Sequence, residues 1–101
     1  MPKYLVTYHG GEMPTDPAAA EQVKAAFGAW LAEAGSAVID PGAPVRMVTQ
    51  VAGGETDEPA EIDGYSVIEA DSVMAATAVL KSHPFVARGG TLQLNEALEL
   101  P

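Results

Sequence analysis

The sequence lacks cysteine and has few cations. With no cysteine among 101 residues, disulfides, thiolate metal sites and a cysteine nucleophile are excluded. Lysine and arginine together number 5 against 14 acids, which gives a formal net charge of −9. The bases form no run, and binding to a phosphate backbone needs clustered cations, so we expect no nucleic-acid partner. The acidity is interpreted first as a solubility feature.

Long apolar runs and histidines are also scarce. No apolar run approaches the roughly 18 residues that span a bilayer. The amino-terminal segment MPKYLVTYHGG has one lysine and too short an apolar stretch for a secretory signal, so we expect a cytoplasmic protein with no membrane partner. The chain has 2 histidines, fewer than the ligands that a metal site normally needs, so we expect no metal and no cofactor.

The chain is rich in apolar residues. Hydrophobic residues make up 48% of it, which is typical of a packed globule rather than a disordered chain. At this length we expect one domain over residues 1–101. So short a chain leaves apolar surface partly exposed, and association with a second copy is a natural way to complete the core.

The carboxy-terminal half predicts one strand–helix–strand unit. An apolar segment is followed by a capping residue, a helical run, a proline turn, a glycine pair and an alternating segment. The predicted elements are a strand over 65–69, a helix from Asp71 or Ser72 to Lys81 with Val73, Ala76, Thr77 and Leu80 inward, a turn at His83-Pro84, and a strand from Thr91 that carries Leu92, Leu94, Leu98 and Leu100 on one face.

The amino-terminal half predicts a strand, a long helix and then shorter strands. Asp16 and Pro17 are typical of a helix start, and Gly35 is typical of a helix end. The predicted elements are a strand over 3–8, a helix over 17–34 with Val23, Phe27, Trp30, Leu31 and Ala34 inward, a loop over 12–15, a strand over 37–40, a turn at Pro41-Gly42, a strand over 45–52 and an acidic loop over 53–63.

This order predicts an α+β fold. The two helices would cover one face of an antiparallel sheet in a ferredoxin-like two-layer sandwich, in which the middle strands are able to merge into one hairpin. Two small helices cannot cover every apolar strand face, so we expect one apolar sheet face to be open. The apolar residues that the helices would have to cover are Tyr4, Val6, Tyr8, Leu92, Leu94, Leu98 and the Val45–Val51 face. We therefore predict that two copies pack sheet against sheet about a two-fold axis.

Three segments resemble the YCII-related (DGPF-type) family of the dimeric α+β barrel superfamily. They are KYLVTYHGGE near the start, GYSVIEADS in the centre, and HPF followed by GGTLQL near the end. Segment 56–61 is similar to the family's DGPF loop, with aspartate and proline present and glycine and phenylalanine absent. The resemblance covers nearly the whole chain. It implies a sheet-to-sheet dimer and, in each protomer, a cavity between helices and sheet where relatives have a suspected active site.

The resemblance also bears on catalysis. The chemistry suspected in the family uses a histidine on the first helix and an aspartate before a proline near the end of the second. The matching positions here are occupied by Phe27 and His83, so the sequence departs from the histidine–aspartate pair at both.

His9 and His83 are the candidate catalytic residues, because histidine serves as a general acid or base near neutral pH. His9 ends the first strand beside Gly10-Gly11, where a strand end is able to face a cleft; the alternative is an ordinary polar strand end. His83 precedes Pro84, and its alternative role is interaction with the carboxy-terminal dipole of the second helix.

The candidate substrate-binding residues are Arg46, Tyr8, Tyr65 and Phe27. A guanidinium binds carboxylates through its planar fork, although an ion pair with a neighbouring acid would also explain Arg46. The aromatic side chains would line an apolar pocket or simply belong to the core. Arg88 precedes Gly89-Gly90, a turn able to cradle an anion, but two glycines are a weak signal.

Two functions remain open. In the first, a homodimeric YCII-like protein binds a small organic molecule and catalyses proton transfer, with His9 or His83 as base and Arg46 as anion anchor. In the second, the protein is a non-catalytic ligand-binding or protein-interaction module, which the departures at Phe27 and His83 favour. Convergence of both histidines and Arg46 on one solvent-reachable cavity would favour the first function, and separate surface positions would favour the second.

Overall fold

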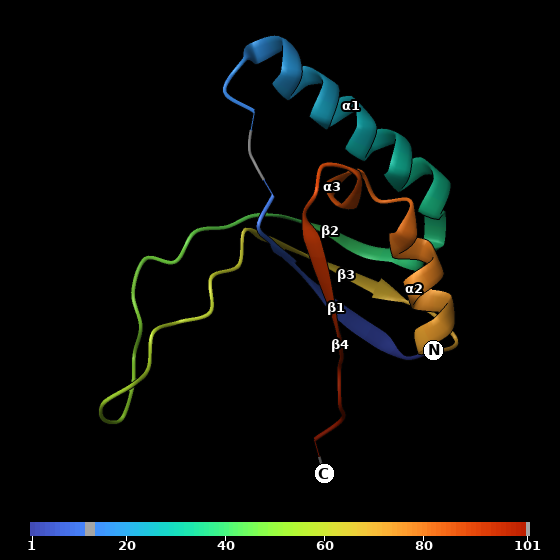
Figure 1. The fold of residues 1–101 in the computed structure, drawn as a ribbon. Coiled ribbons are helices and arrows are strands. Elements are labelled where there is room, and N and C mark those ends of the chain that lie inside the picture. Colours follow the sequence, from blue (N-terminus) through green and yellow to red (C-terminus); the bar gives the residue numbers. More distant parts are fainter. Residues whose placement is uncertain (12–13, 101) are drawn as a thin grey trace.

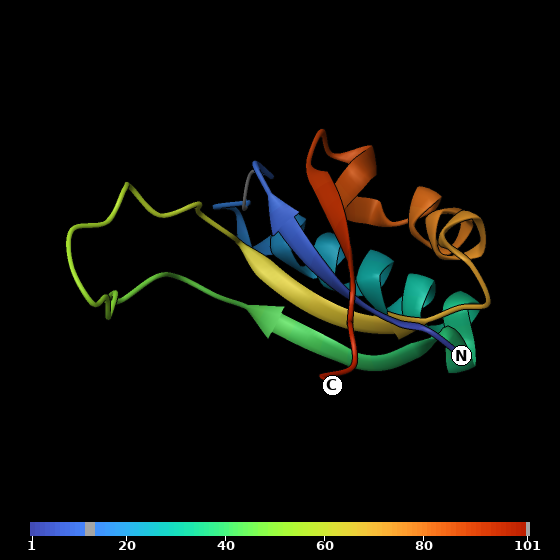
Figure 2. The same cartoon turned by 90° about the horizontal axis from the view of Figure 1, so that it is seen from below.

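A computed structural model describes residues 1–11 and 14–100 of the chain. Its elements are β1 (Lys3–His9), α1 (Pro17–Ala34), the 3-10 turn η1 (Gly35–Ala37), β2 (Val38–Pro44), β3 (Gly64–Glu69), α2 (Val73–Lys81), α3 (Pro84–Ala87) and β4 (Thr91–Glu96). The strands form one antiparallel sheet in the order β2-β3-β1-β4. All the α-helices lie on one face of it (Figures 1 and 2). The prediction of a ferredoxin-like α+β sandwich is confirmed.

The helix boundaries follow from the capping residues. Asp16 accepts a hydrogen bond from the Ala18 N–H at 3.2 Å, and Gly35 ends α1 with a positive φ of 57°. Ser72 accepts from the Ala75 N–H at 3.1 Å and so caps α2. Within the described residues, no helix is long and apolar enough to cross a membrane.

The core lies between α1, α2 and the two central strands. Tyr4 and Val6 of β1 are buried together with Ile68 of β3 and Trp30 of α1. The Trp30 indole N–H donates to the Val79 carbonyl oxygen at 3.0 Å, which joins α1 to α2 and satisfies a buried donor. The predicted inward stripe of α1 is confirmed, because Trp30 is buried and Val23, Phe27, Leu31 and Ala34 are half-buried, whereas the helix residues between them are exposed.

The predicted turn at Pro41-Gly42 is wrong. Both residues lie inside β2, where the pairing with β3 shifts register between Asp40 and Ala43. Gly42 has a φ of 74°, and a β-carbon there would collide with the Tyr65 carbonyl oxygen, so glycine allows the irregular strand to continue.

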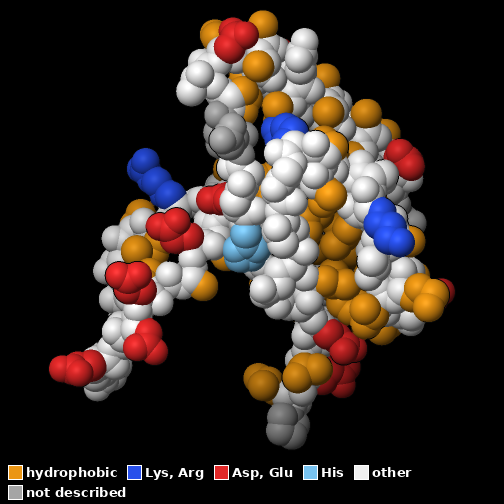
Figure 3. Space-filling model, in the orientation of Figure 1, with side chains coloured by type: hydrophobic (Ala, Val, Ile, Leu, Met, Phe, Trp, Pro, Cys, Tyr) orange, Lys and Arg blue, Asp and Glu red, His pale blue; other side chains and the backbone are white. Residues whose placement is uncertain are grey.

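The predicted strand over 45–52 is also wrong. Residues 45–63 form an extended arm without helix or strand that projects from the sheet (Figure 1). Its base is closed by the Val45 N–H, which donates to the Asp63 carbonyl oxygen at 3.0 Å. Acidic side chains follow one another along the arm (Figure 3). The arm explains a radius of gyration of 15.0 Å, against about 13 Å for a compact chain of this length.

Only some of the apolar residues predicted to lie in strands face the helices, as expected, because Leu98 and segment 45–51 lie outside the sheet. Tyr4 and Val6 are in the core, and Tyr8, Leu92 and Leu94 pack against it. The sequence predicted too many apolar residues for that layer, because Leu98 and Leu100 lie beyond the end of β4 and are exposed. On α2 the inward residues are Ala75, Ala76, Val79 and Leu80, whereas Val73 and Thr77 are exposed.

The opposite sheet face is therefore mixed rather than purely apolar. The alternation of β1 directs Leu5, Thr7 and His9 away from the helices. Leu5 remains 41% exposed. Polar side chains of β4 accompany it, and the Asn95 amide donates to the Leu5 carbonyl oxygen at 3.0 Å.

Phe85 of α3 joins the ends of β1 and β4. A β-carbon on Gly11 or on Gly90 would collide with opposite edges of its ring, so both glycines make room for it. The ring is 5% exposed and meets the Tyr8 ring edge-on, with centroids 5.1 Å apart. Gly11 and Gly90 therefore have a packing role around one aromatic side chain.

We predict that Gly90→Ala destabilises the protein by about 1–3 kcal/mol, because the added methyl group overpacks the Phe85 ring. Gly28→Ala is the matched control. Gly28 lies in α1, and a methyl group added to it would have open space within 4 Å, so alanine should stabilise the helix by up to about 1 kcal/mol. Urea denaturation measures both changes, and equal midpoints for Gly90→Ala and the wild type would contradict the packing role.

Candidate functional site

A cavity of about 440 Å³ lies between α1 and the sheet, with α3 forming one wall. We call it the helix–sheet cavity. One face of α1 lines it through Ala20, Val23, Lys24 and Phe27, which share the spacing of a single helix face. The other aromatic and charged residues that line it are Tyr8, Asp63, Tyr65, His83, Phe85 and Arg88. Its volume is that of a small-molecule site.

A chain of hydrogen bonds runs along one wall of this cavity. The Phe85 N–H donates to Nδ1 of His83 at 3.0 Å. Nε2 of His83 lies 2.9 Å from the Tyr8 hydroxyl, which lies 2.7 Å from the Ser66 hydroxyl. Ser66 donates in turn to the Pro41 carbonyl oxygen at 2.8 Å. The chain therefore connects α3, β1, β3 and β2.

The direction of every hydrogen bond in this chain is fixed by its two ends. Phe85 supplies a backbone N–H, which only donates, so Nδ1 of His83 carries no proton and Nε2 carries it. Pro41 supplies a carbonyl oxygen, which only accepts, so the Ser66 proton is committed to it. His83 therefore donates to Tyr8, and Tyr8 donates to Ser66. The arrangement holds His83 as a neutral Nε2–H tautomer.

The surroundings of His83 favour the same neutral form. The imidazole is 2% exposed and is packed among the rings of Tyr8, Phe27 and Trp30, with centroids 4.3–5.7 Å away. Burial lowers the pKa of His83 to about 4, and the nearby Arg88 charge acts in the same direction. Burial also raises the pKa of the Tyr8 phenol, against the opposing hydrogen bond to Ser66.

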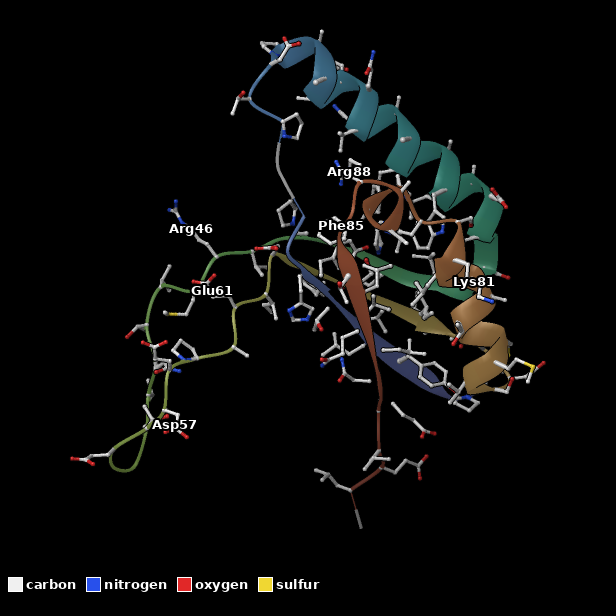
Figure 4. The ribbon with its side chains drawn as sticks, in the orientation of Figure 1. Arg46, Asp57, Glu61, Lys81, Phe85 and Arg88 are labelled. Carbon is white, nitrogen blue, oxygen red and sulfur yellow. The ribbon has the colours of Figure 1, made fainter. Side chains whose placement is uncertain are left out.

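Arg88 at the end of α3 contributes the guanidinium of the cavity wall (Figure 4). Its charged group lies 5.6 Å from the centroid of the Phe85 ring, in cation–π contact. Its Nε and Nη1 are sealed from solvent and have no hydrogen-bond partner within residues 1–11 and 14–100. Arg88 is therefore a polar side chain of this wall whose hydrogen-bonding groups are left without acceptors by the described residues.

Two further charged residues lie on the cavity. Asp63 accepts a hydrogen bond at Oδ2 from the Gly10 N–H at 2.8 Å, and its own N–H donates to the Tyr8 carbonyl oxygen at 2.6 Å. It therefore fixes the base of the arm to the end of β1. Lys24 is exposed at the cavity rim.

The structure brings together some of the residues selected from sequence and separates others. Tyr8, Phe27, Tyr65 and His83 line the helix–sheet cavity. Tyr65 belongs to the lining, but it alternates with the buried Gly64 and Ser66, so its ring lies on the opposite sheet face and does not form an aromatic wall of the cavity. Their roles in binding or catalysis remain predictions.

His9 and Arg46 do not line the cavity. His9 lies on the opposite sheet face, where its Nδ1 donates to the Glu61 carbonyl oxygen at 2.9 Å and its Nε2 lies 2.7 Å from the Thr7 hydroxyl. Arg46 is exposed on the arm (Figure 4). The two histidines and Arg46 therefore do not converge on one site.

Sequence reasoning did not select Ser66, Asp63 or Arg88 as site residues. Ser66 alternates with apolar neighbours in a strand, which gives no sign of a buried hydroxyl in a network. Arg88 was noted only for the glycines that follow it. The available signal for Arg88 was its position directly after a short helix that begins at the His83-Pro84 pair.

No metal site is formed by the residues described. Within residues 1–11 and 14–100, no group of three or more histidine, aspartate or glutamate side chains is arranged to hold a metal ion.

Fold and site together define the class of protein: a ferredoxin-like α+β protein with a small-molecule-sized cavity under its first helix. The fold is similar to that of 5-chloro-2-hydroxyhydroquinone dehydrochlorinase (TftG) from Burkholderia phenoliruptrix AC1100, solved in complex with 2,5-dihydroxybenzoquinone. The TM-score is 0.54 with 19% sequence identity, over 90% of each chain. This likeness agrees with the predicted α+β fold.

The sequence itself matches no family model, and no curated protein is similar to it. The likeness to TftG therefore carries the fold and not a shared activity.

The lowered pKa of His83 predicts a pH-dependent stability. The unfolded chain takes up a proton on this imidazole near its ordinary pKa of 6.5, and the folded chain only near 4. The contribution of the neutral His83 to the free energy of unfolding is fully present above pH 6.5. It is lost as the pH falls from 6.5 to 4. Across this window the free energy of unfolding should fall by up to about 1.4 kcal/mol per pH unit through His83.

Urea denaturation at several pH values measures this contribution. His83→Asn should remove it, because asparagine still caps α3 but does not titrate. His9→Asn is the matched control, because it replaces the other histidine, on the opposite sheet face, and leaves His83 in place. If His83→Asn and the wild type lose stability in parallel between pH 6.5 and 4, the assignment of a neutral buried His83 is wrong.

Proposed function

We propose that this protein is a YCII-related homodimer that binds a small organic molecule in the helix–sheet cavity and does not catalyse proton transfer. The observation that carries the proposal is a cavity of about 440 Å³ with aromatic walls, whose histidine is already committed to internal hydrogen bonds. TftG, which has the same fold, was solved with a small quinone, and this supports a binding role for the fold.

The fixed polarity of the hydrogen-bond chain argues against a proton shuttle. A relay passes a proton on only if its members are able to exchange donor and acceptor roles. Here Phe85 contributes an N–H at one end and Pro41 a carbonyl oxygen at the other, and neither group is able to reverse. For His83 to accept a proton at Nδ1, the capping hydrogen bond of α3 would have to break.

A second candidate function is acid–base catalysis on the bound molecule. It is favoured by the position of His83 and Tyr8 in the cavity wall and by the dehydrochlorinase activity in the name of TftG. In that case Tyr8 would act on the ligand after giving up its bond to Ser66. Turnover of a bound ligand that is lost in Tyr8→Phe would establish this second function in place of the first.

The homodimer rests on apolar surface that one chain leaves uncovered. Leu5 on the open sheet face is 41% exposed, and Val48 and Val51 on the arm are 81% and 97% exposed. A partner packed on the open face would cover Leu5 and offer a surface for the arm. Leu5 on the sheet face and the valines on the adjoining arm together support an association surface.

The binding proposal predicts saturable binding of 2,5-dihydroxybenzoquinone to the wild-type protein. Isothermal titration measures it, and Ala20→Trp should abolish it by filling the cavity beside Val23 and Lys24. Ala29→Trp is the matched control, because Ala29 lies on α1 outside the cavity lining, and it should bind as the wild type does. Binding that survives Ala20→Trp, or no binding by the wild type, would contradict the proposed site.

The dimer predicts a sedimentation mass of twice 10.4 kDa at micromolar concentration. Leu5→Glu should shift the protein to the monomer, because it introduces a charge at the centre of the open face. Val73→Glu is the control, because Val73 is 58% exposed on α2, away from that face, and the dimer should persist. A wild-type monomer would refute the homodimer.

A further inference from the structure

We infer that Arg88 is the anion-binding group of the helix–sheet cavity and that the ligand is a planar organic anion, such as an aromatic carboxylate. This inference rests on the proposed binding function and goes beyond it by naming the ligand class. Arg88 rather than Arg46 is the arginine that lines the cavity.

The first argument is the unsatisfied guanidinium. Nε and Nη1 of Arg88 are sealed from solvent without a hydrogen-bond partner among the residues described. Burying charged N–H groups without acceptors is costly, and native proteins leave few such groups. A carboxylate is the acceptor whose two oxygens match the planar guanidinium fork, so it is the ligand group that an unsatisfied arginine favours.

The second argument is that Arg88 is held in place before any ligand arrives. Its charge lies 5.6 Å from the Phe85 ring centroid, and the Phe85 ring is itself enclosed by the backbone at Gly11 and Gly90. A preorganised cation loses less conformational entropy on binding than a free surface arginine. Arg46, exposed on the arm, has no such support.

The third argument is the balance of charge around the cavity. The chain has a formal net charge of −9, so most of its surface repels anions. Among the lining residues that the structure describes, Lys24 and Arg88 face one carboxylate, Asp63, and Oδ2 of that carboxylate already accepts from the Gly10 N–H. The cavity is thus a local cationic site on an acidic protein.

The walls of the cavity select the shape of the ligand. The aromatic rings of Tyr8, Phe27 and Phe85 line the same space as Arg88. Flat aromatic walls pack well against a flat ring. An anionic group on such a ring would reach the guanidinium while the ring lies against these side chains. The cation and the aromatic walls together fit an aromatic acid better than an aliphatic or a neutral ligand.

Benzoate and benzamide form a matched pair of probes, because they share ring and shape and differ in charge. Isothermal titration of the wild-type protein should give tighter binding of benzoate than of benzamide. Arg88→Gln should weaken benzoate binding roughly 10- to 100-fold, the loss expected for a charge-assisted pair, and weaken benzamide binding much less, so that the preference for benzoate disappears. Arg88→Lys keeps the charge without the planar fork and should give an intermediate benzoate affinity.

Arg46→Gln is the control, because it makes the same charge change outside the cavity and should keep the wild-type preference. If benzoate and benzamide bind the wild type equally, or if Arg88→Gln keeps the preference, the inference fails while the binding function stands. If Arg46→Gln abolishes the preference, net charge rather than Arg88 is responsible and the inference again fails. If neither probe binds the wild type, the proposed binding function fails together with the inference.

Discussion

A directed chain of four hydrogen bonds is the constraint on which the rest of this molecule depends. It begins at the Phe85 N–H, passes through His83, Tyr8 and Ser66, and ends at the Pro41 carbonyl oxygen. It connects α3 with three strands of the sheet, including the irregular part of β2. Because each buried polar group in it has a partner, the chain of hydrogen bonds stabilises one arrangement of these elements. If one of these groups lost its partner, the buried polar group left behind would destabilise the fold.

The same chain separates the polar groups of the helix–sheet cavity into two kinds. His83 and Tyr8 use their hydrogen-bonding capacity within the fold, and the low pKa of His83, near 4, agrees with a neutral ring that acts as a structural donor. Arg88 has sealed nitrogens that no described residue satisfies. A histidine in a cavity wall is therefore weak support for catalysis until the partners of both ring nitrogens are known.

The sequence predicted the helix boundaries, because residues close to each helix end determine them. The caps at Asp16 and Ser72 and the stop at Gly35 act within a few residues of each helix end, and they placed both long helices correctly. Contacts between distant residues were not predictable. Tyr8 meets Ser66 and His83 across separations of 58 and 75 residues, and the collision that requires Gly42 inside β2 comes from Tyr65 on another strand.

The most direct test of this account is the tautomer of His83 in the folded protein, which long-range ¹H–¹⁵N NMR of the imidazole reports near neutral pH. The account predicts a proton on Nε2, in slow exchange, and an unprotonated Nδ1 that accepts from the Phe85 N–H. A proton on Nδ1, or a ring that averages between the two tautomers, would show that the chain is not directed and would restore His83 as a candidate base.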